Sequence, residues 1–251
     1  MQELIKDLRG FKLSGMANSL SDRLHYAQNN KLGYQEFLSL LCEDEISARR
    51  DNSYKRRVNA SKLPSSKKLE DFDFTFQPSI DAKIINDLAI CKYIDAGENI
   101  IFIGDSGTGK THLSIGLANK ALAREYSVYF TTVSDMLYNL HIAKADNSYH
   151  KKVQQLLNYD LLILDELGFK QLPKYSADDF FTVISKRYEN KSTIITTNKD
   201  FTAWSEIFTD ELLSRAIIDR VMHHAYIMNI KGKSYRMNKA KNGGKNELKI
   251  F

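Results

Sequence analysis

The stretch GDSGTGKT, residues 104–111, has residue types and spacing that suit the phosphates of a nucleoside triphosphate. The pattern Gly-x4-Gly-Lys-Thr predicts a tight turn whose backbone N–H groups point at the phosphates, next to the positive end of a helix dipole. Lys110 is expected to reach the β- and γ-phosphates, and the Thr111 hydroxyl to ligate Mg²⁺. The expected nucleotide-contacting residues are Gly104, Asp105, Ser106, Gly107, Thr108, Gly109, Lys110, Thr111 and His112.

Two consecutive acids end another apolar run, LLILDE at 161–166. An acid that ends a buried strand is costly unless a cation meets it, so Asp165 is expected to hold Mg²⁺ directly or through water. Glu166 is expected to polarise an attacking water. A site that only binds nucleotide has no need of this second acid, so the pair favours ATP hydrolysis. Asn198, which ends the run STIITTN, can hydrogen-bond both the water and the γ-phosphate.

Arginines near the end of the chain could supply the positive charge that phosphoryl transfer requires. Arg220 follows an apolar helical stretch and is the candidate for acting on the site of a neighbouring subunit. Arg236 lies beyond the last expected strand and is the candidate for acting on its own subunit's site. A surface salt bridge is the alternative role for each.

Short apolar runs must position these residues. They are NIIFIG (99–104), SVYFTT (127–132), LLILDE (161–166), STIITTN (192–198) and AYIMNI (225–230). Strands buried on both faces read as continuous apolar runs, and their alternation with stretches of helical length predicts a parallel sheet. Such sheets bind ligands at the carboxyl ends of their strands, where the glycine loop and the acid pair fall. The expected fold class is α/β, with a parallel five-stranded sheet between helices.

Before this sheet the sequence is helical in pattern, because apolar residues recur at spacings of three to four without strand-like alternation. Pro64 and the serines after it should end the last helix. We therefore expect a small all-helical domain at 1–66, a nucleotide-binding domain at 67–237 and a basic flexible tail at 238–251.

Basic residues gather at the two ends of the chain. Residues 1–70 hold 13 Lys and Arg against 9 Asp and Glu, residues 71–230 hold 16 against 21, and residues 231–251 hold 7 against 1. Such basic extensions favour a polyanionic partner, most often nucleic acid, and lysines that only maintain solubility are the alternative. Neither a membrane span nor the apolar core of a signal peptide is present in the sequence, so a cytoplasmic protein with no membrane partner is expected.

Together the motifs resemble those of an AAA+ ATPase of the initiator and helicase-loader clade. Within this clade the chain is similar to the IstB family, the helper ATPases of certain bacterial insertion sequences, and more distantly to the DnaC helicase loaders. The resemblance covers nearly the whole chain and is most specific at FLSLLCEDEISARRDNSYKRRVNASKLPSSKKLEDFDF (37–74) and DRVMHHAYIMNIKGKSYRM (219–237). Alignment with the DnaC ending places Arg220 on the arginine finger and Arg236 on the sensor-2 arginine.

The resemblance implies a homo-oligomer that assembles with ATP and Mg²⁺ on double-stranded DNA, shares its ATP sites between subunits and recruits a cognate transposase. A helicase loader that binds single-stranded DNA is the alternative, and a small metabolic kinase is a third reading. AAA+ proteins usually carry a helical lid that holds the sensor-2 arginine. Only about 50 residues follow Asn198 here, so we expect that lid to be minimal or absent.

Two groups of side chains are candidates for nucleic-acid contact. A basic cluster in the helical domain could grip DNA, or dock on a neighbouring subunit or the transposase. The polar insert at 141–155 falls where this clade has an extra helix along the nucleic-acid channel, and two more residues follow the LLILDE run. The candidates are Arg49, Arg50, Lys55, Arg56, Arg57, Lys144, Tyr149, Lys151, Lys152, Lys170 and Tyr175. An ordinary solvated position is the alternative for each.

The remaining residues of metal-binding type give no metal-ligand pattern. Cys42 and Cys91 lie far apart in the sequence and are expected to be buried free thiols. The pair His223-His224 has no nearby acid or cysteine at metal-ligand spacing, so we expect it to be packed or on the surface at the start of a strand.

Overall fold

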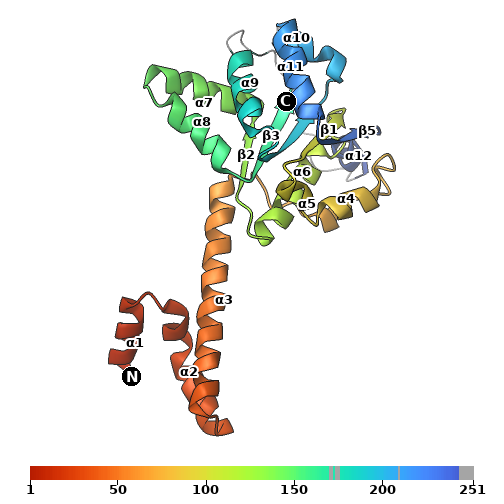
Figure 1. Ribbon diagram of the computed structural model, residues 1–251. Helices are drawn as coiled ribbons and strands as arrows, with labels where there is room; N and C mark the ends of the chain where they lie inside the picture. Colours follow the sequence, from red (N-terminus) through yellow and green to blue (C-terminus); the bar gives the residue numbers. More distant parts are fainter. Residues whose placement is uncertain (170–171, 173–175, 209, 243–251) are drawn as a thin grey trace, which may run out of the picture. The chain divides into compact units, whose positions relative to one another are not determined.

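A computed structural model describes residues 1–169, 172, 176–208 and 210–242 of this protein (Figure 1). The chain divides into two compact units, the first formed by residues 1–57 and the second beginning at Val58. The division falls within one long helix, which ends at Ser61, five residues before the expected domain boundary at 66.

The first unit consists of α1 (Gln2–Gly10), α2 (Ser14–Asn30) and most of α3 (Tyr34–Ser61). Glu45, on α3, is buried and accepts hydrogen bonds from the backbone N–H groups of Gly15 and Met16 at 2.7 and 3.2 Å, so it caps the start of α2. The Arg49 guanidinium donates to the same carboxylate at 2.7 Å and holds its pKa below the ordinary value. The all-helical prediction for this region is confirmed.

The second unit is built on a parallel sheet with the strand order β2-β3-β4-β1-β5. Its strands are β1 (Asn99–Gly104), β2 (Val128–Thr132), β3 (Leu161–Leu167), β4 (Ser192–Thr197) and β5 (Ala225–Ile230). Each expected apolar run is a strand, with ends that differ by at most one residue. The α/β prediction is confirmed.

Helices cover both faces of this sheet. They are α4 (Ala82–Leu88), α5 (Lys92–Asp95), α6 (Lys110–Ala123), α7 (Val133–Ala145), α8 (Tyr149–Asn158), α9 (Ser176–Arg187), α10 (Trp204–Phe208), α11 (Glu211–Met222) and α12 (Tyr235–Asn242), with short 3-10 turns at Leu69–Asp71 and Phe201–Ala203. Alternate residues of β1 enter two separate cores: Ile100 and Phe102 pack with α6, whereas Ile101 and Ile103 pack with α7, α9 and α11.

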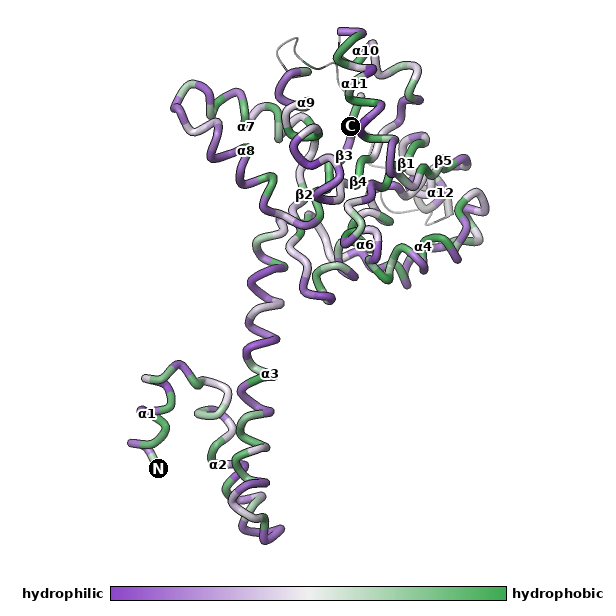
Figure 2. Tube along the Cα trace, viewed as in Figure 1, coloured by the Kyte–Doolittle hydropathy of each residue, from purple (hydrophilic) through white to green (hydrophobic). Residues whose placement is uncertain are grey.

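Figure 2 shows how hydrophobic and hydrophilic residues are distributed over the helices and strands. The strands β1, β3 and β4 are mostly apolar and are buried on both faces, whereas the edge strand β5 is partly exposed. Helix α3 is hydrophilic along much of its length. Cys91 is buried, as expected, but Cys42 is exposed on α3, so the prediction of two buried thiols is wrong at this position. None of the helices in the described part of the chain combines the length and apolar character that crossing a membrane requires.

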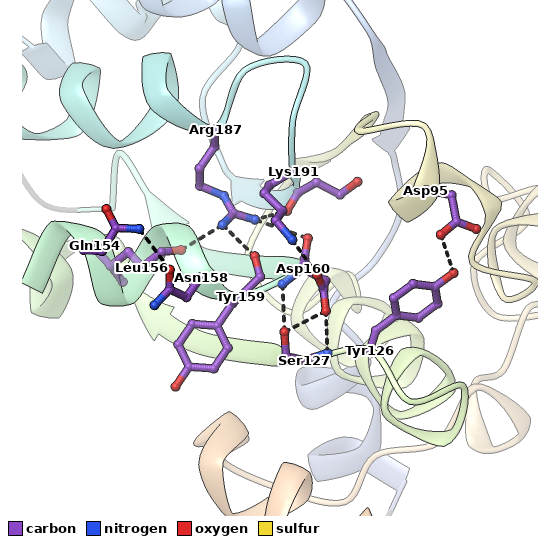
Figure 3. Close-up of polar contacts among 11 residues, drawn as sticks. Asp95, Tyr126, Ser127, Gln154, Leu156, Asn158, Tyr159, Asp160, Arg187 and Lys191 are labelled. Carbon is purple, nitrogen blue, oxygen red and sulfur yellow. Dashed lines mark hydrogen bonds and ion pairs between the residues drawn. The ribbon is translucent and has the colours of Figure 1, made fainter.

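One buried arginine connects several chain segments at the edge of the sheet where the strands begin (Figure 3). Arg187, at the end of α9, is 1% exposed, and its guanidinium donates to the carbonyls of Leu156, Tyr159 and Ser192 at 2.8, 2.9 and 2.6 Å. Burial lowers the pKa of Arg187 to about 9, so the group stays charged at neutral pH. The carbonyls compensate the buried charge. Their hydrogen bonds with the guanidinium join the end of α8 to the start of β4.

Removing this guanidinium should destabilise the second unit. Arg187→Met leaves the three carbonyls buried without their donor, and we expect the free energy of unfolding to fall by about 3 kcal/mol. Urea denaturation measures the change. The neighbouring Lys186 is exposed, so Lys186→Met should leave stability nearly unchanged. Equal stabilities of the two variants would contradict the role given to Arg187.

Candidate nucleotide-binding site

The glycine loop runs from the end of β1 to the start of α6, and two of its glycines are required by close approach as well as by conformation. Gly107 has φ +83°, and a Cβ there would lie 2.1 Å from the Ser234 hydroxyl. Gly109 precedes α6 with φ +102°, and its Cβ would lie 2.5 Å from the Phe72 ring. The loop therefore has contacts on two sides that leave no room for a side chain.

Lys110 lies at the first turn of α6 with its ammonium group folded under the glycine loop. Its Nζ donates to the carbonyls of Gly104 and Asp105 at 2.6 and 2.8 Å. Burial lowers the pKa of Lys110, and the negative charges of Asp165 and Asp105 oppose that change. The charge is thus held beside the N-terminus of α6, where a phosphate would meet backbone N–H groups as well.

Asp165 is the buried centre of a hydrogen-bond network at the end of β3. Its carboxylate is 5% exposed and accepts the Thr111 hydroxyl, with Oγ1 at 3.0 and 3.1 Å from the two carboxylate oxygens. The Thr196 hydroxyl, from the neighbouring β4, also donates to Asp165 and accepts the backbone N–H of Glu166 at 3.0 Å. A hydroxyl and a carboxylate are oxygen ligands of the type that Mg²⁺ prefers, so Thr111 and Asp165 fit this ion.

Glu166 has a backbone conformation that is rare for a residue with a side chain. Its φ is +64°, and the pairing of β3 with β4 shifts register between Leu164 and Leu167. This irregularity exposes Glu166 between buried neighbours and turns it toward the nucleotide cavity, which it lines. Strained backbone of this kind costs about 1–3 kcal/mol and persists only where surrounding structure fixes it. Here the Thr196 hydroxyl holds the Glu166 N–H.

A cavity of about 380 Å³ lies over the loop and the ends of the strands. The structure brings the expected residues Ser106–His112, Glu166, Asn198 and Arg236 to its lining. A second wall comes from the part of the second unit that precedes α4, through Lys67, Asp71, Phe72, Asp73 and Gln77. Sequence analysis missed this wall. The volume is in the range of small-molecule sites, and the Phe72 ring meets His112 edge-on at 5.4 Å, which gives one side an aromatic surface.

The segment after β5 closes the cavity next to the glycine loop. The backbone N–H of Tyr235 donates to the Gly107 carbonyl at 2.9 Å, and the Gln77 side-chain amide donates to the Lys233 carbonyl at 2.9 Å. Arg236 follows directly at the start of α12 and lines the cavity. Helix α12 also covers 238–242, the first residues of the segment expected to be a flexible tail.

Arg220 lies elsewhere. It is half-buried on α11, donates to the Ala216 carbonyl at 3.0 Å, and places its guanidinium 4.8 Å from the centre of the Phe181 ring on α9. The described residues that line the cavity include Arg236 and not Arg220. The two arginines therefore lie at different places in the second unit.

The basic residues of the first unit that are candidates for nucleic-acid contact differ in the contacts of their side chains. Arg49 is bound to Glu45, and Arg57 donates to the Ser53 hydroxyl at 2.8 Å. The other three, Arg50, Lys55 and Arg56, are exposed on α3.

The candidates of the second unit divide in the same way. Lys144 and the Tyr149 hydroxyl both bind the buried carboxylate of Asp179 at 2.8 Å, which joins α7, α8 and α9. Burial, together with the hydrogen bond to Asp179, raises the pKa of Tyr149 to about 12. Lys151 and Lys152 are exposed on α8, which lies beside α7 (Figure 1). Lys170 and Tyr175 lie outside the described residues.

Comparison with known proteins places this geometry in a family. The model of the IstB-like ATP binding proteins matches residues 6–243. This chain belongs to that family. The IstB-like protein is 40% identical over 236 residues to the ATP-binding protein of insertion sequence IS232 from Bacillus thuringiensis subsp. berliner, covering 94% of each chain. It is 38% identical to the ATP-binding protein of insertion sequence IS21 from Pseudomonas aeruginosa, covering 97% of this chain and 92% of that protein.

Solved structures show the same fold at lower identity. The DnaC helicase loader superposes with a TM-score of 0.54 at 24% identity, covering 70% of this chain and 99% of that one. The replication initiator DnaA bound to AMPPCP and single-stranded DNA gives 0.55 at 19%, covering 72% of this chain and 55% of that one. The second unit of the IstB-like protein therefore has the AAA+ P-loop fold, as predicted.

Thr196 is a site residue that sequence analysis missed, although strand alternation gives a signal for it. Residues two apart in a strand share a face, so Thr196 accompanies Asn198 at the same edge. Thr196→Val should remove one hydrogen bond from Asp165 and one from the Glu166 N–H. We expect the gain in ATP affinity that Mg²⁺ confers to fall about tenfold.

Titration of a fluorescent ATP analogue with and without Mg²⁺ measures this gain. Thr196→Ser keeps the hydroxyl and serves as the matched control, with affinity close to that of the unaltered protein. If the valine variant kept the full effect of Mg²⁺, Thr196 would not position Asp165.

Proposed function

We propose that this IstB-like protein is an Mg²⁺-dependent ATPase that oligomerises on double-stranded DNA and assists a cognate transposase in target selection and insertion sequence transposition. The observation that carries the catalytic part is the strained Glu166, which lines the cavity beside the Thr111–Asp165 pair. A carboxylate held there at a cost in backbone energy has a use in activating water.

The contacts support a set of hydrolytic roles. Thr111 and Asp165 would hold Mg²⁺, which would stabilise the charge of the phosphates, and Lys110 neutralises phosphate charge beside the glycine loop. Glu166 draws the proton from the attacking water, while the Asn198 amide orients that water toward the γ-phosphate. Arg236 lines the same cavity, which supports its action on its own subunit's nucleotide.

The position of Arg220 supports oligomerisation. Its guanidinium is on α11 and packs over Phe181, away from the described lining of its own cavity. An arginine that stabilises the transition state from such a position does so in a neighbouring subunit's site. Hydrolysis then depends on assembly, because each complete site contains residues of two subunits.

DNA binding is supported by exposed basic side chains and by the relatives. Arg50, Lys55 and Arg56 on α3, with Lys151 and Lys152 on α8, are exposed and suited to phosphate contacts. Such contacts give affinity without sequence choice. The relatives are proteins of insertion sequences, which supports a transposase as the partner.

Replacing the proposed base should separate binding from hydrolysis. We expect Glu166→Gln to bind ATP, to lose at least about 100-fold in ATP hydrolysis, and to form long-lived oligomers on duplex DNA. Phosphate release and electron microscopy with ATP and either duplex or single-stranded DNA measure these properties. A variant that stays monomeric with ATP and duplex DNA would contradict the assembly, and assembly on single strands alone would favour a helicase loader.

Mixing two inactive variants tests whether Arg220 acts between subunits. We expect Arg220→Ala to lower hydrolysis by at least about 100-fold on its own. A mixture with Glu166→Gln should hydrolyse ATP severalfold faster than either variant, because some interfaces then contain one intact Glu166 and one intact Arg220. The control is Arg215→Ala, since Arg215 is exposed and paired with Glu211 on the same helix. No recovery in a mixture shown to co-assemble would give Arg220 another role.

A further inference from the structure

In the structure Glu189 lies next to His223 and His224, although it is distant from them in the sequence. One ligand atom from each of Glu189, His223 and His224 lies within 4.8 Å of the others. The Glu189 carboxylate oxygen is 3.8 Å from His223 Nδ1 and 3.9 Å from His224 Nε2. The sequence predicts no acid at metal-ligand spacing from these histidines, and this expectation is wrong in space, because Glu189 lies beside them although 33 residues of chain separate it from His223.

Both imidazoles face the same way because of the turn that carries them. Consecutive residues of a strand point to opposite faces of a sheet. His223 and His224 instead lie in the turn between α11 and β5, with ring centres 4.1 Å apart. The His224 carbonyl accepts the backbone N–H of Asn99 at 2.7 Å, which fixes this turn to the start of β1.

The turn that carries Glu189 is also fixed. Glu189 follows α9 with φ +58°, two residues after the buried Arg187. The Arg187 carbonyl accepts the backbone N–H of Asn190 at 3.0 Å, and Gly97 approaches the Glu189 backbone so closely that a Cβ there would lie 3.2 Å from it. Only the exposed side chains need to move for the three ligand atoms to converge.

We propose that Glu189, His223 and His224 form a binding site for a divalent transition-metal ion such as Zn²⁺. Imidazole nitrogen and carboxylate oxygen are ligands of this class of ion, and three protein ligands leave a fourth position to water. Bond lengths of about 2.0–2.1 Å require ligand atoms roughly 3.3 Å apart, so the distances between the ligand atoms shorten by up to about 1.5 Å. These ligands lie where strands begin and are not among the described residues that line the nucleotide cavity, so the site is separate from that cavity.

One existing contact competes with the metal. The Tyr188 hydroxyl lies 2.6 Å from His223 Nδ1, and binding exchanges this hydrogen bond for a metal–nitrogen bond. The bound ion joins the turn after α9 to the turn after α11. Since α11 carries Arg220 and packs against α9, the ion fixes the helix on which that arginine lies.

Titration of the full-length, chelator-treated protein tests the site. Excess Mg²⁺ is kept present to occupy the oxygen ligands at Asp165. We expect one equivalent of Zn²⁺ to bind, the Tm to rise by about 5 °C at saturation, and Co²⁺ to give the visible absorption of a tetrahedral site. Glu189→Gln, His223→Ala and His224→Ala should each weaken binding at least tenfold.

Two control variants make the result specific. His25 is an exposed histidine of the first unit, so His25→Ala should bind Zn²⁺ like the unaltered protein. Tyr188→Phe removes the competing hydrogen bond and should bind as tightly or more tightly. The proposal is overturned if no saturable Co²⁺ band appears, if His25→Ala loses binding as the three ligand variants do, or if Tyr188→Phe abolishes it.

Discussion

A single buried carboxylate holds the nucleotide site together. Asp165 ends β3 in a position from which water is almost excluded, and an ionised acid there is tolerated only when its oxygens are occupied. Thr111 from α6 and Thr196 from β4 occupy them. This fixes the glycine loop, the acid pair and the polar end of β4 relative to one another. The oxygens that would meet a Mg²⁺ ion are therefore already gathered by the fold.

The opposite edge of the sheet uses the reverse arrangement. There a buried cation, Arg187, is surrounded by backbone carbonyls, and it fixes the turns from which β3 and β4 begin. Charge is thus buried at both ends of the strands, an anion where the nucleotide binds and a cation where the turns meet. Between them the strands are apolar on both faces, which leaves the two ends as the places where polar groups determine geometry.

What the sequence could predict depended on how local the signal was. The strands and the loop follow from runs of a few residues, and the Thr111–Asp165 contact follows from the rule that parallel strands end at one edge. The wall formed by Phe72 and Gln77, and the bond from Tyr235 to Gly107, join parts of the chain far apart in sequence and carry no local pattern. The position of Glu189 beside the histidines could not be predicted from the sequence for the same reason, since it depends on the packing of α9 against α11.

The backbone at Glu166 has a consequence for how this protein tolerates change. Glycine adopts a φ of +64° without strain, so glycine would suit the bulge in β3 better than glutamate does. Selection for thermostability alone would therefore favour replacement of this glutamate. Stabilising substitutions elsewhere in the protein would usually leave its function unchanged. Glutamate at this position lowers the stability of the fold, so a stabilised variant of this protein should keep it and carry its substitutions elsewhere.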